Sequence, residues 1–239
     1  MNKDRILFLH GWLFDSRIWF GLDKSFSKKN KVTLIDLPGY GKNKADKSKA
    51  INYCRNLFSN QASPSVLISW SFGGLLSLLS LSKDCPFIKK VIIINSNLSL
   101  IDNSSEINLK NIKKMKKELL LDRKKALKRF FFECVKGSSK ELKDYRLLID
   151  EFKLTTLPNN QTLINGLDDM INFDFYNNLK DTQKEVVIIS SSKDSLLGDK
   201  YYTEFKNKKN IKICSLDNSP HMPFISYKKE VVQIIKEFI

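Results

Sequence analysis

The stretch that most constrains the fold of this chain is a tight turn, containing a serine, between an apolar run and a helical run. Residues 65–68 form the apolar run, and residues 75–79 are predicted to form a helix. The turn between them is Ser69-Trp70-Ser71-Phe72-Gly73-Gly74. Its small residues suit a sharp turn in which neighbouring backbones approach closely. A strand that enters a helix in this way is typical of α/β proteins with parallel sheets.

The same turn has the layout of a nucleophile elbow, in which a serine hydroxyl is pushed out from the backbone. We therefore expect Ser71 to be a nucleophile. The N–H groups that follow it lie at a helix N-terminus, where an oxyanion is stabilised. The motif is S-x-S-x-G rather than G-x-S-x-G, because Ser69 stands where glycine is usual. Ser69 is small enough to fill that place.

Six short runs rich in β-branched and apolar residues are predicted to be buried strands. Helical segments lie between several of them, for example at residues 51–59, 75–82 and 201–206, and residues 228–239 are predicted to form a closing amphipathic helix. Strands that alternate with helices indicate an α/β fold with a mostly parallel, doubly wound sheet. The six runs are Arg5–Leu9, Lys31–Leu37, Ser65–Ser69, Lys90–Asn95, Glu185–Ser190 and Ile211–Leu216.

The alternation breaks over residues 98–179, which have helical periodicity, many charges and no convincing strand. Within this stretch, residues 112–120 and 126–135 are predicted to form amphipathic helices. We expect a helical lid inserted over the carboxyl ends of the strands, where α/β sheets bind ligands. Residues 1–97 and 180–239 would then form the core.

A serine nucleophile needs a base within hydrogen-bond reach, and the base needs an orienting acid. His221 directly follows the last predicted strand and is the only histidine downstream of the serine. Asp194 lies in the loop after the preceding strand, and the order Ser…Asp…His is the one expected of an α/β-hydrolase. Asp199 and Asp217 are rival candidates for the acid. We predict a Ser71, Asp194, His221 triad.

The end of the first predicted strand supplies a further element of the site. His10-Gly11-Trp12 follows that strand and turns at the glycine, so a backbone N–H can point into the same site. In hydrolases with a nucleophile elbow, the oxyanion hole pairs an N–H from this loop with the N–H after the nucleophile. Trp12 and Phe72 are the corresponding residues. His10 is interpreted as a structural loop residue rather than a second base.

Length and composition fit one large α/β domain, or a core with one inserted subdomain. The chain has 239 residues, of which 42% are hydrophobic and 28% are charged. The hydrophobic content is enough for a packed core, and the charged fraction argues against disorder. No apolar run approaches the roughly 18 residues needed to span a membrane. The first five residues lead straight into a predicted strand and leave no room for a signal peptide. We expect a cytoplasmic protein with no membrane partner.

The cysteines show no pattern of a binding site, whereas the basic residues are concentrated in one segment. Cys54, Cys85, Cys134 and Cys214 are scattered, with no metal-site or disulfide spacing, so we expect no metal and no cofactor. The net charge is +15, and residues 110–146 alone carry 14 Lys or Arg against 5 Asp or Glu. This basic segment is either a solvated helical face or a docking surface for an acidic partner.

Four motifs occur in order at α/β-hydrolase spacings, and together they resemble the biotin-pathway carboxylesterase family, which acts on the methyl ester of pimeloyl-[acyl-carrier protein]. The resemblance covers essentially the whole chain. It implies an α/β-hydrolase fold, serine esterase activity and an acidic acyl-carrier protein as partner. The motifs are His10-Gly11-Trp12, residues 34–41 (Leu-Ile-Asp-Leu-Pro-Gly-Tyr-Gly), Trp70-Ser71-Phe72-Gly73-Gly74 and residues 221–226 (His-Met-Pro-Phe-Ile-Ser).

In this family a helical lid covers the site, and its basic residues grip the carrier protein and its phosphopantetheine arm. By this resemblance Lys125, Arg129 and Arg146 are docking residues, and Phe130 lines the acyl channel. The chain departs from the family pattern at Cys134, where a polar lid residue is usual, and at Leu142, beside Lys143, where a basic one is usual. Asn43 replaces the usual serine after the Pro-Gly-x-Gly turn.

Other functions stay open at this stage. A different α/β-hydrolase activity, such as a short-chain carboxylesterase, a thioesterase or a C–C bond hydrolase, would use the same triad. A binding protein that kept the fold and lost catalysis is disfavoured by the intact Ser71, Asp194 and His221. A nucleic-acid binder is disfavoured because the chain has no recognised nucleic-acid motif and its charges cluster on the expected lid.

Overall fold

The structure is a computed structural model that describes residues 5–45, 49–98, 106–172, 174–197, 202, 205 and 207–239. The helix that we predict at residues 201–206 lies largely outside the described residues. In the described part of the chain, no helix is both long enough and apolar enough to cross a membrane.

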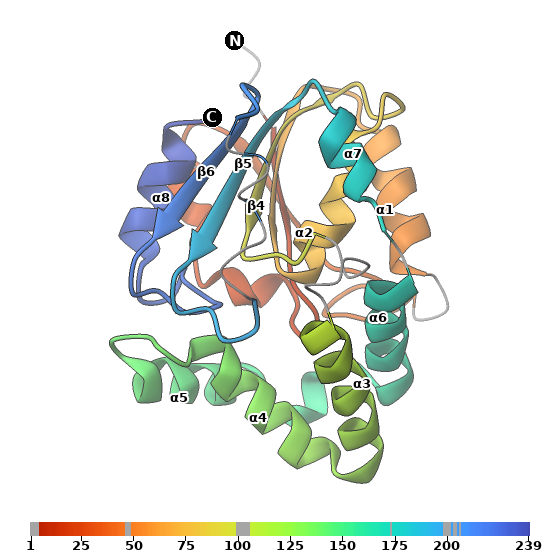
Figure 1. The fold of residues 1–239 in the computed structure, drawn as a ribbon, viewed down its shortest axis with the longest axis vertical. Coiled ribbons are helices and arrows are strands. Elements are labelled where there is room, and N and C mark those ends of the chain that lie inside the picture. Colours follow the sequence, from red (N-terminus) through yellow and green to blue (C-terminus); the bar gives the residue numbers. More distant parts are fainter. Residues whose placement is uncertain are drawn as a thin grey trace.

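The centre of the molecule is a sheet of six parallel strands in the order β2-β1-β3-β4-β5-β6, which confirms the predicted α/β fold (Figure 1). All six predicted strands form; β1 and β6 have the predicted bounds, and the ends of the other four shift by at most two residues. β2 stops at Ile35, before the loop that holds Pro38, a residue without a backbone N–H to donate. The strands are β1 (Arg5–Leu9), β2 (Lys31–Ile35), β3 (Ser65–Trp70), β4 (Ile88–Ile94), β5 (Glu185–Ser191) and β6 (Ile211–Leu216).

Helices cover both faces of this sheet, as a doubly wound fold requires (Figure 1). One face carries α8, and the other carries α1, α2 and α7. All six residues of the central strand β3 are buried, because the sheet is covered on both sides. The covering helices are α1 (Ala50–Ser59), α2 (Phe72–Ser77), α7 (Tyr176–Asp181) and α8 (Lys228–Lys236), with the short 3-10 helix η3 (Leu78–Leu81) after α2.

A separate layer of helices lies beyond the carboxyl ends of the strands (Figure 1). These helices fall within the stretch where we expect a lid, and we call them the helical layer. α4 begins at Arg123 because the Asp122 carboxylate accepts a hydrogen bond from the Lys125 N–H, at 3.0 Å, and caps the helix. The layer consists of α3 (Glu106–Leu121), α4 (Arg123–Val135), α5 (Glu141–Glu151) and α6 (Asn160–Asn172).

The expected boundary between lid and core, at residues 179 and 180, falls inside α7. This helix packs on the core, where the Asn178 side chain donates to the Leu78 carbonyl at 3.1 Å. The domain boundaries stay a prediction, and these contacts argue for ending the inserted segment before Tyr176.

Candidate active site

Ser71 occupies a strained position between β3 and α2. Its φ of 53° and ψ of −121° lie in a region that non-glycine residues rarely adopt, and such strain gathers at functional sites. The Ser71 carbonyl accepts hydrogen bonds from the Gly74 and Leu75 N–H groups, at 2.8 and 3.2 Å. Helix α2 therefore begins at Phe72, three residues before the predicted start, because Ser71 itself serves as the N-terminal cap residue.

The small residues around Ser71 are explained by close backbone contacts. A Cβ atom added to Gly73 would lie 2.4 Å from the His10 carbonyl oxygen, so the turn passes too near the end of β1 for any side chain. Ser69 is fully buried, and its hydroxyl donates to the Ile92 carbonyl at 3.3 Å. This bond satisfies the hydroxyl, which explains why serine is accommodated where glycine is usual.

Replacing Gly73 with alanine is expected to destabilise the fold by about 1–3 kcal/mol, because the added methyl group must push the turn away from the His10 carbonyl. Thermal denaturation of the purified variant measures this loss. Gly21, where the nearest heavy atom to an added Cβ is 3.6 Å away, has room for a side chain but a positive φ of 74°. A Gly21→Ala variant therefore reports backbone strain without a clash, and an equal loss at both positions would contradict the close-contact explanation.

The structure brings Ser71, His221 and Asp194 into one hydrogen-bonded chain. His221 Nε2 lies 3.0 Å from Ser71 Oγ, and His221 Nδ1 lies 2.7 Å from Asp194 Oδ2. A carboxylate only accepts hydrogen bonds, so the proton sits on Nδ1 and Nε2 is free to accept from the serine hydroxyl. The His221 and Asp194 side chains are only 2% and 3% exposed, which strengthens the interaction between them.

The acid is further held by its own loop. Asp194 Oδ1 accepts from the Leu196 and Leu197 N–H groups, at 2.9 and 3.1 Å. Of the two rival candidates, Asp217 is exposed in the turn after β6, and Asp199 lies outside the described residues. Asp194 is therefore the carboxylate that the described structure places against His221.

The predicted oxyanion-hole residues Trp12 and Phe72 both line the cavity that contains Ser71. Phe72 is the first residue of α2, and the first N–H groups of a helix have no partner within the helix. The Trp12 side chain is anchored to the helical layer, because its Nε1 donates to the Leu163 carbonyl of α6 at 2.9 Å.

His10 fixes the loop that carries Trp12. It is fully buried, its Nδ1 lies 2.8 Å from the Gly11 carbonyl oxygen, and its Nε2 accepts from the Leu37 N–H at 3.0 Å. Burial lowers the pKa of His10 and keeps the ring neutral. The Gly11 carbonyl belongs to the same peptide unit as the Trp12 N–H, so this bond also orients that N–H. These contacts agree with a structural role for His10.

The cavity above Ser71 has a volume of about 320 Å³ and lies between the sheet and the helical layer. Phe130 of α4 lines it and packs edge-on against Trp12, with ring centroids 4.9 Å apart. Most of the lining is apolar, while Lys114, Arg129 and Glu133 add charged groups from α3 and α4. The apolar part of the wall comes from Trp12, Phe72, Leu75, Ile112, Met115, Phe130, Leu167, Met170, Leu196 and Leu197. Among the described residues, no group of three or more His, Cys, Asp or Glu side chains could hold a metal ion.

The end of α4 is bonded to the loops that carry the base and the acid. The Met222 N–H, next to His221, donates to the Cys134 carbonyl at 2.9 Å. The Ser195 hydroxyl, next to Asp194, lies 2.9 Å from Glu133 Oε2. Cys134 is itself fully buried and absent from the cavity wall, and Glu133 lines the cavity in its place.

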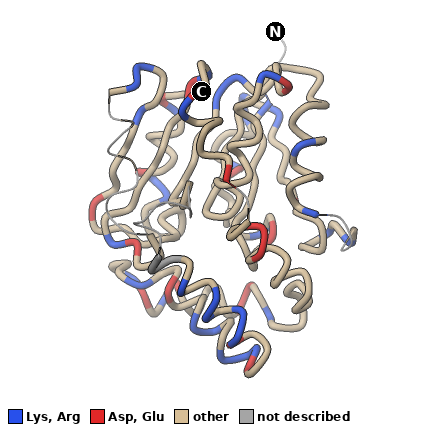
Figure 2. Tube along the Cα trace, turned by 45° about the vertical axis from the view of Figure 1, so that its right-hand side comes forward, with Lys and Arg blue, Asp and Glu red and all other residues tan. Residues whose placement is uncertain are grey.

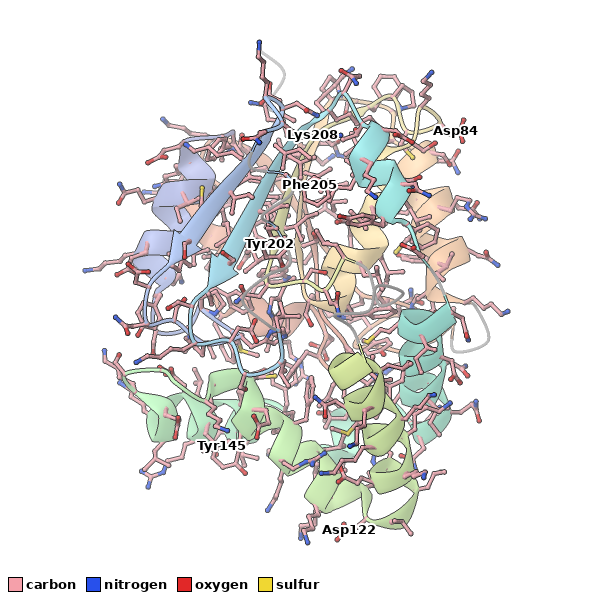
Figure 3. The ribbon with its side chains drawn as sticks, viewed as in Figure 1. Asp84, Asp122, Tyr145, Tyr202, Phe205 and Lys208 are labelled. Carbon is pink, nitrogen blue, oxygen red and sulfur yellow. The ribbon has the colours of Figure 1, made fainter. Side chains whose placement is uncertain are left out.

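Lys and Arg residues are crowded along the helical layer (Figure 2), and the expected docking residues belong to its helices α4 and α5. Lys125 and Arg129 line one groove between α4 and α5, and Arg129 also pairs with Glu118 of α3. Arg146 is exposed on α5 and is not part of the groove wall. Asp122 and Tyr145, which also line this groove, are labelled in Figure 3. Sequence reasoning missed Lys124 and Lys128, whose side chains complete the groove.

Sequence reasoning also missed polar residues behind the site. Asn95 follows β4 and Ser191 ends β5, and their side chains bond to each other at 2.8 Å. The only sequence signal at Asn95 is a polar residue at the end of an apolar strand, which turn residues commonly produce.

The comparisons with known proteins agree with this architecture. The sequence is 28% identical to a protein of Wigglesworthia glossinidia brevipalpis named pimeloyl-[acyl-carrier protein] methyl ester esterase, covering 98% of this chain and 93% of that protein. A protein of the same name from Legionella pneumophila is 25% identical, and the alignment covers 98% of this chain and 94% of that protein.

A solved esterase structure from Exiguobacterium antarcticum has the same fold, with a TM-score of 0.83 at 14% identity, covering 99% of this chain and 92% of that one. Residues 6–234 match the family described as the alpha/beta hydrolase family. Because this match spans nearly the whole chain, the protein belongs to the alpha/beta hydrolase family and is a hydrolase.

Proposed function

We propose that this protein is a serine carboxylesterase that hydrolyses the methyl ester of pimeloyl-[acyl-carrier protein] and releases methanol. The observation that carries the esterase mechanism is the chain of hydrogen bonds from Asp194 through His221 to Ser71, which opens into an apolar cavity. The carrier-bound substrate is supported by the names of the relatives and by the basic groove on the helical layer.

In the first half of the proposed reaction, Ser71 Oγ attacks the ester carbonyl carbon while His221 Nε2 takes the hydroxyl proton. The N–H groups of Trp12 and Phe72 hold the oxyanion that forms. When the tetrahedral intermediate collapses, the protonated His221 gives its proton to the leaving methoxide. Methanol departs, and the acyl group stays on Ser71 as an ester.

In the second half, a water molecule loses a proton to His221 and attacks the acyl-enzyme carbonyl. The intermediate collapses with the C–O bond to Ser71 breaking, and His221 returns the proton to Ser71 Oγ. Asp194 holds Nδ1–H throughout, so Nε2 faces the reacting oxygen in both halves. The products are the free carboxylate on its carrier and the restored enzyme.

The helical layer accounts for how a carrier-bound chain would reach Ser71. We propose that residues 98–179 contain a lid, because α3, α4 and α6 supply one wall of the cavity. Lys125 and Arg129 lie in the basic groove on its outer side, and Arg129 reaches both the groove and the cavity. An acidic carrier bound at the groove would therefore present its acyl arm next to the cavity.

Reversing two exposed charges, with Lys125→Glu and Arg146→Glu in one variant, is expected to raise KM for the carrier-bound methyl ester about tenfold or more, since close charge pairs at interfaces couple by about 1.5 kcal/mol or more. KM for a free methyl ester of the same acid is expected to stay unchanged, because neither residue lines the cavity. Methanol release from both substrates measures the difference.

The matched control carries Lys229→Glu and Lys236→Glu in one variant, which makes the same total charge change at exposed positions of α8, away from the helical layer. Its KM for the carrier-bound ester is expected to equal that of the wild type. Raising the salt concentration should increase the KM of the wild type for the carrier-bound ester, because salt screens the charges. The KM of the wild type should then approach that of the reversed variant. Equal effects of the reversal on both substrates would remove the docking role.

The substrate itself is tested by complementation. A biotin auxotroph that lacks its pathway esterase is expected to grow without biotin when it expresses this chain, and not when it expresses the Ser71→Ala variant. If the wild-type chain fails to restore growth but hydrolyses short p-nitrophenyl esters, the esterase mechanism is supported and the pimeloyl substrate is rejected.

A further inference from the structure

A single buried side chain, that of Asn95, bonds both to the end of the strand that leads to Asp194 and to the loop that carries His221. Asn95 directly follows β4, is fully buried and has a positive φ of 41°. Asparagine enters this left-handed region more readily than most residues. A buried amide needs partners for both its donor and its acceptor, and those of Asn95 lie at the end of β5 and in the loop of His221.

The first set of partners is at the end of β5, on the side of the acid. The Ser191 N–H donates to Asn95 Oδ1 at 2.9 Å, and Asn95 Nδ2 donates to Ser191 Oγ at 2.8 Å. Asp194 follows three residues later, and its N–H donates to the Ser191 carbonyl at 3.3 Å. The Asn95 amide thus fixes the base of the turn from which Asp194 projects.

The second set of partners is in the loop of the base. Asn95 Nδ2 lies 2.9 Å from the His221 carbonyl oxygen and 3.1 Å from that of Pro220. The His221 carbonyl also accepts from Trp70 Nε1, at 2.9 Å. Trp70 is the last residue of β3 and directly precedes Ser71. The backbone of His221 is therefore bonded both to the strand that leads to the nucleophile and, through Asn95, to the strand that leads to the acid.

We propose that Asn95 is a positioning residue that sets the spacing of Asp194 and His221 and so aligns His221 Nε2 with Ser71 Oγ. It does not touch substrate, because it is fully buried and does not line the cavity. The three groups of the site come from the ends of three strands, and their contacts of 2.7 and 3.0 Å depend on how those ends are held. A displacement of about 1 Å between reacting groups can cost about 10²-fold in rate.

The inference rests on the proposed serine esterase mechanism, and its test uses a short p-nitrophenyl ester that needs no carrier. Asn95→Gly keeps the left-handed backbone without steric cost and removes the amide. We expect kcat to fall on the order of 10²-fold while KM stays near the wild-type value. The rate at which a fluorophosphonate labels Ser71 should fall by the same factor.

Asn95→Asp supplies a second variant of nearly equal volume. It keeps an oxygen that can accept from the Ser191 N–H, but it has no N–H to donate to the His221 and Pro220 carbonyls. We expect kcat to fall at least as far as in Asn95→Gly, and the ascending limb of the pH profile of kcat/KM to move in both variants. A residue that only stabilised the fold would lower the melting temperature and leave the pH profile of the folded enzyme unchanged.

Asn218→Gly is the matched control. Asn218 also has a positive φ, of 55°, and it lies three residues before His221, but it is exposed at a turn. Its kcat and pH profile are expected to match the wild type. If Asn95→Gly and Asn95→Asp fail to fold, Ser191→Ala removes only one hydroxyl from the same network, and a kcat equal to that of the wild type would overturn the proposal.

Folded Asn95 variants with wild-type kcat, labelling rate and pH profile would overturn the proposal as well. A wild-type protein that neither hydrolyses the p-nitrophenyl ester nor reacts with the fluorophosphonate would contradict the esterase mechanism instead. The two failures are therefore distinguished by the behaviour of the wild type alone.

Discussion

Replacing Ser71 with alanine is expected to lower kcat for a short p-nitrophenyl ester by a factor on the order of 10⁶, with the fold unchanged. The reason is that the covalent route needs Ser71 Oγ, which lies 3.0 Å from His221 Nε2. His221 and Asp194 cannot substitute for it, because they act on the reaction only through that oxygen. Steady-state hydrolysis and fluorophosphonate labelling both measure the loss.

The matched control is Ser69→Ala, which removes a serine hydroxyl two residues away in the same turn. That hydroxyl donates to the Ile92 carbonyl and has no contact with His221, so the variant is expected to keep most of its activity. Both variants should unfold at temperatures close to that of the wild type. Esterase activity that survives in Ser71→Ala would show that the reaction does not pass through this residue.

Replacing Asp194 with asparagine is expected to lower kcat about 10⁴-fold. The volume hardly changes, but an amide can donate to His221 Nδ1 and so favours the tautomer with its proton on Nε2. That tautomer cannot accept the proton of Ser71 Oγ. The Nδ1–Oδ2 contact of 2.7 Å between two almost fully buried side chains leaves no room for water to replace the carboxylate. A pH series of kcat/KM on the purified variant checks this result.

Asp217→Asn provides the comparison, because Asp217 lies in the turn after β6 and is exposed. It is expected to leave kcat unchanged. An Asp194→Asn variant that keeps more than about a tenth of the wild-type kcat would mean that another carboxylate orients the base. Asp199, which lies outside the described residues, would then be the next residue to substitute.

The fold was largely predictable because its strands are runs of β-branched and other apolar residues between polar or turn-forming segments. Strand ends were less predictable. β4 begins at Ile88, two residues earlier than its apolar run indicates, because Ile88 pairs with Ser65 of β3 even though Lys89 and Lys90 follow it. Gly73 and Gly74 disfavour a helix, so the sequence predicts a later start for α2. The helix nevertheless begins at Phe72, because the Ser71 carbonyl accepts its first hydrogen bonds.

The candidate site was predictable where a residue type is scarce and its position relative to a strand is informative. His221 is one of two histidines, and Asp194 follows a strand end, so few combinations had to be considered. Asn95 had no such signal, because asparagine is abundant after strands. The charge of residues 110–146 indicated a possible docking surface, and the resemblance alone indicated its individual residues. The groove shared by Lys125 and Arg129 depends on how α4 packs against α5, which periodicity does not determine.

The bond between the Met222 N–H and the Cys134 carbonyl joins the helical layer to the base loop through main-chain atoms only. A side chain at either position can change without removing it, provided that the backbone keeps its course and position 222 is not proline. The outer surface of α4 can therefore acquire new residues over evolutionary time while the histidine loop stays attached to the same helix. An attachment of this kind allows the specificity of a hydrolase to diverge faster than its chemistry.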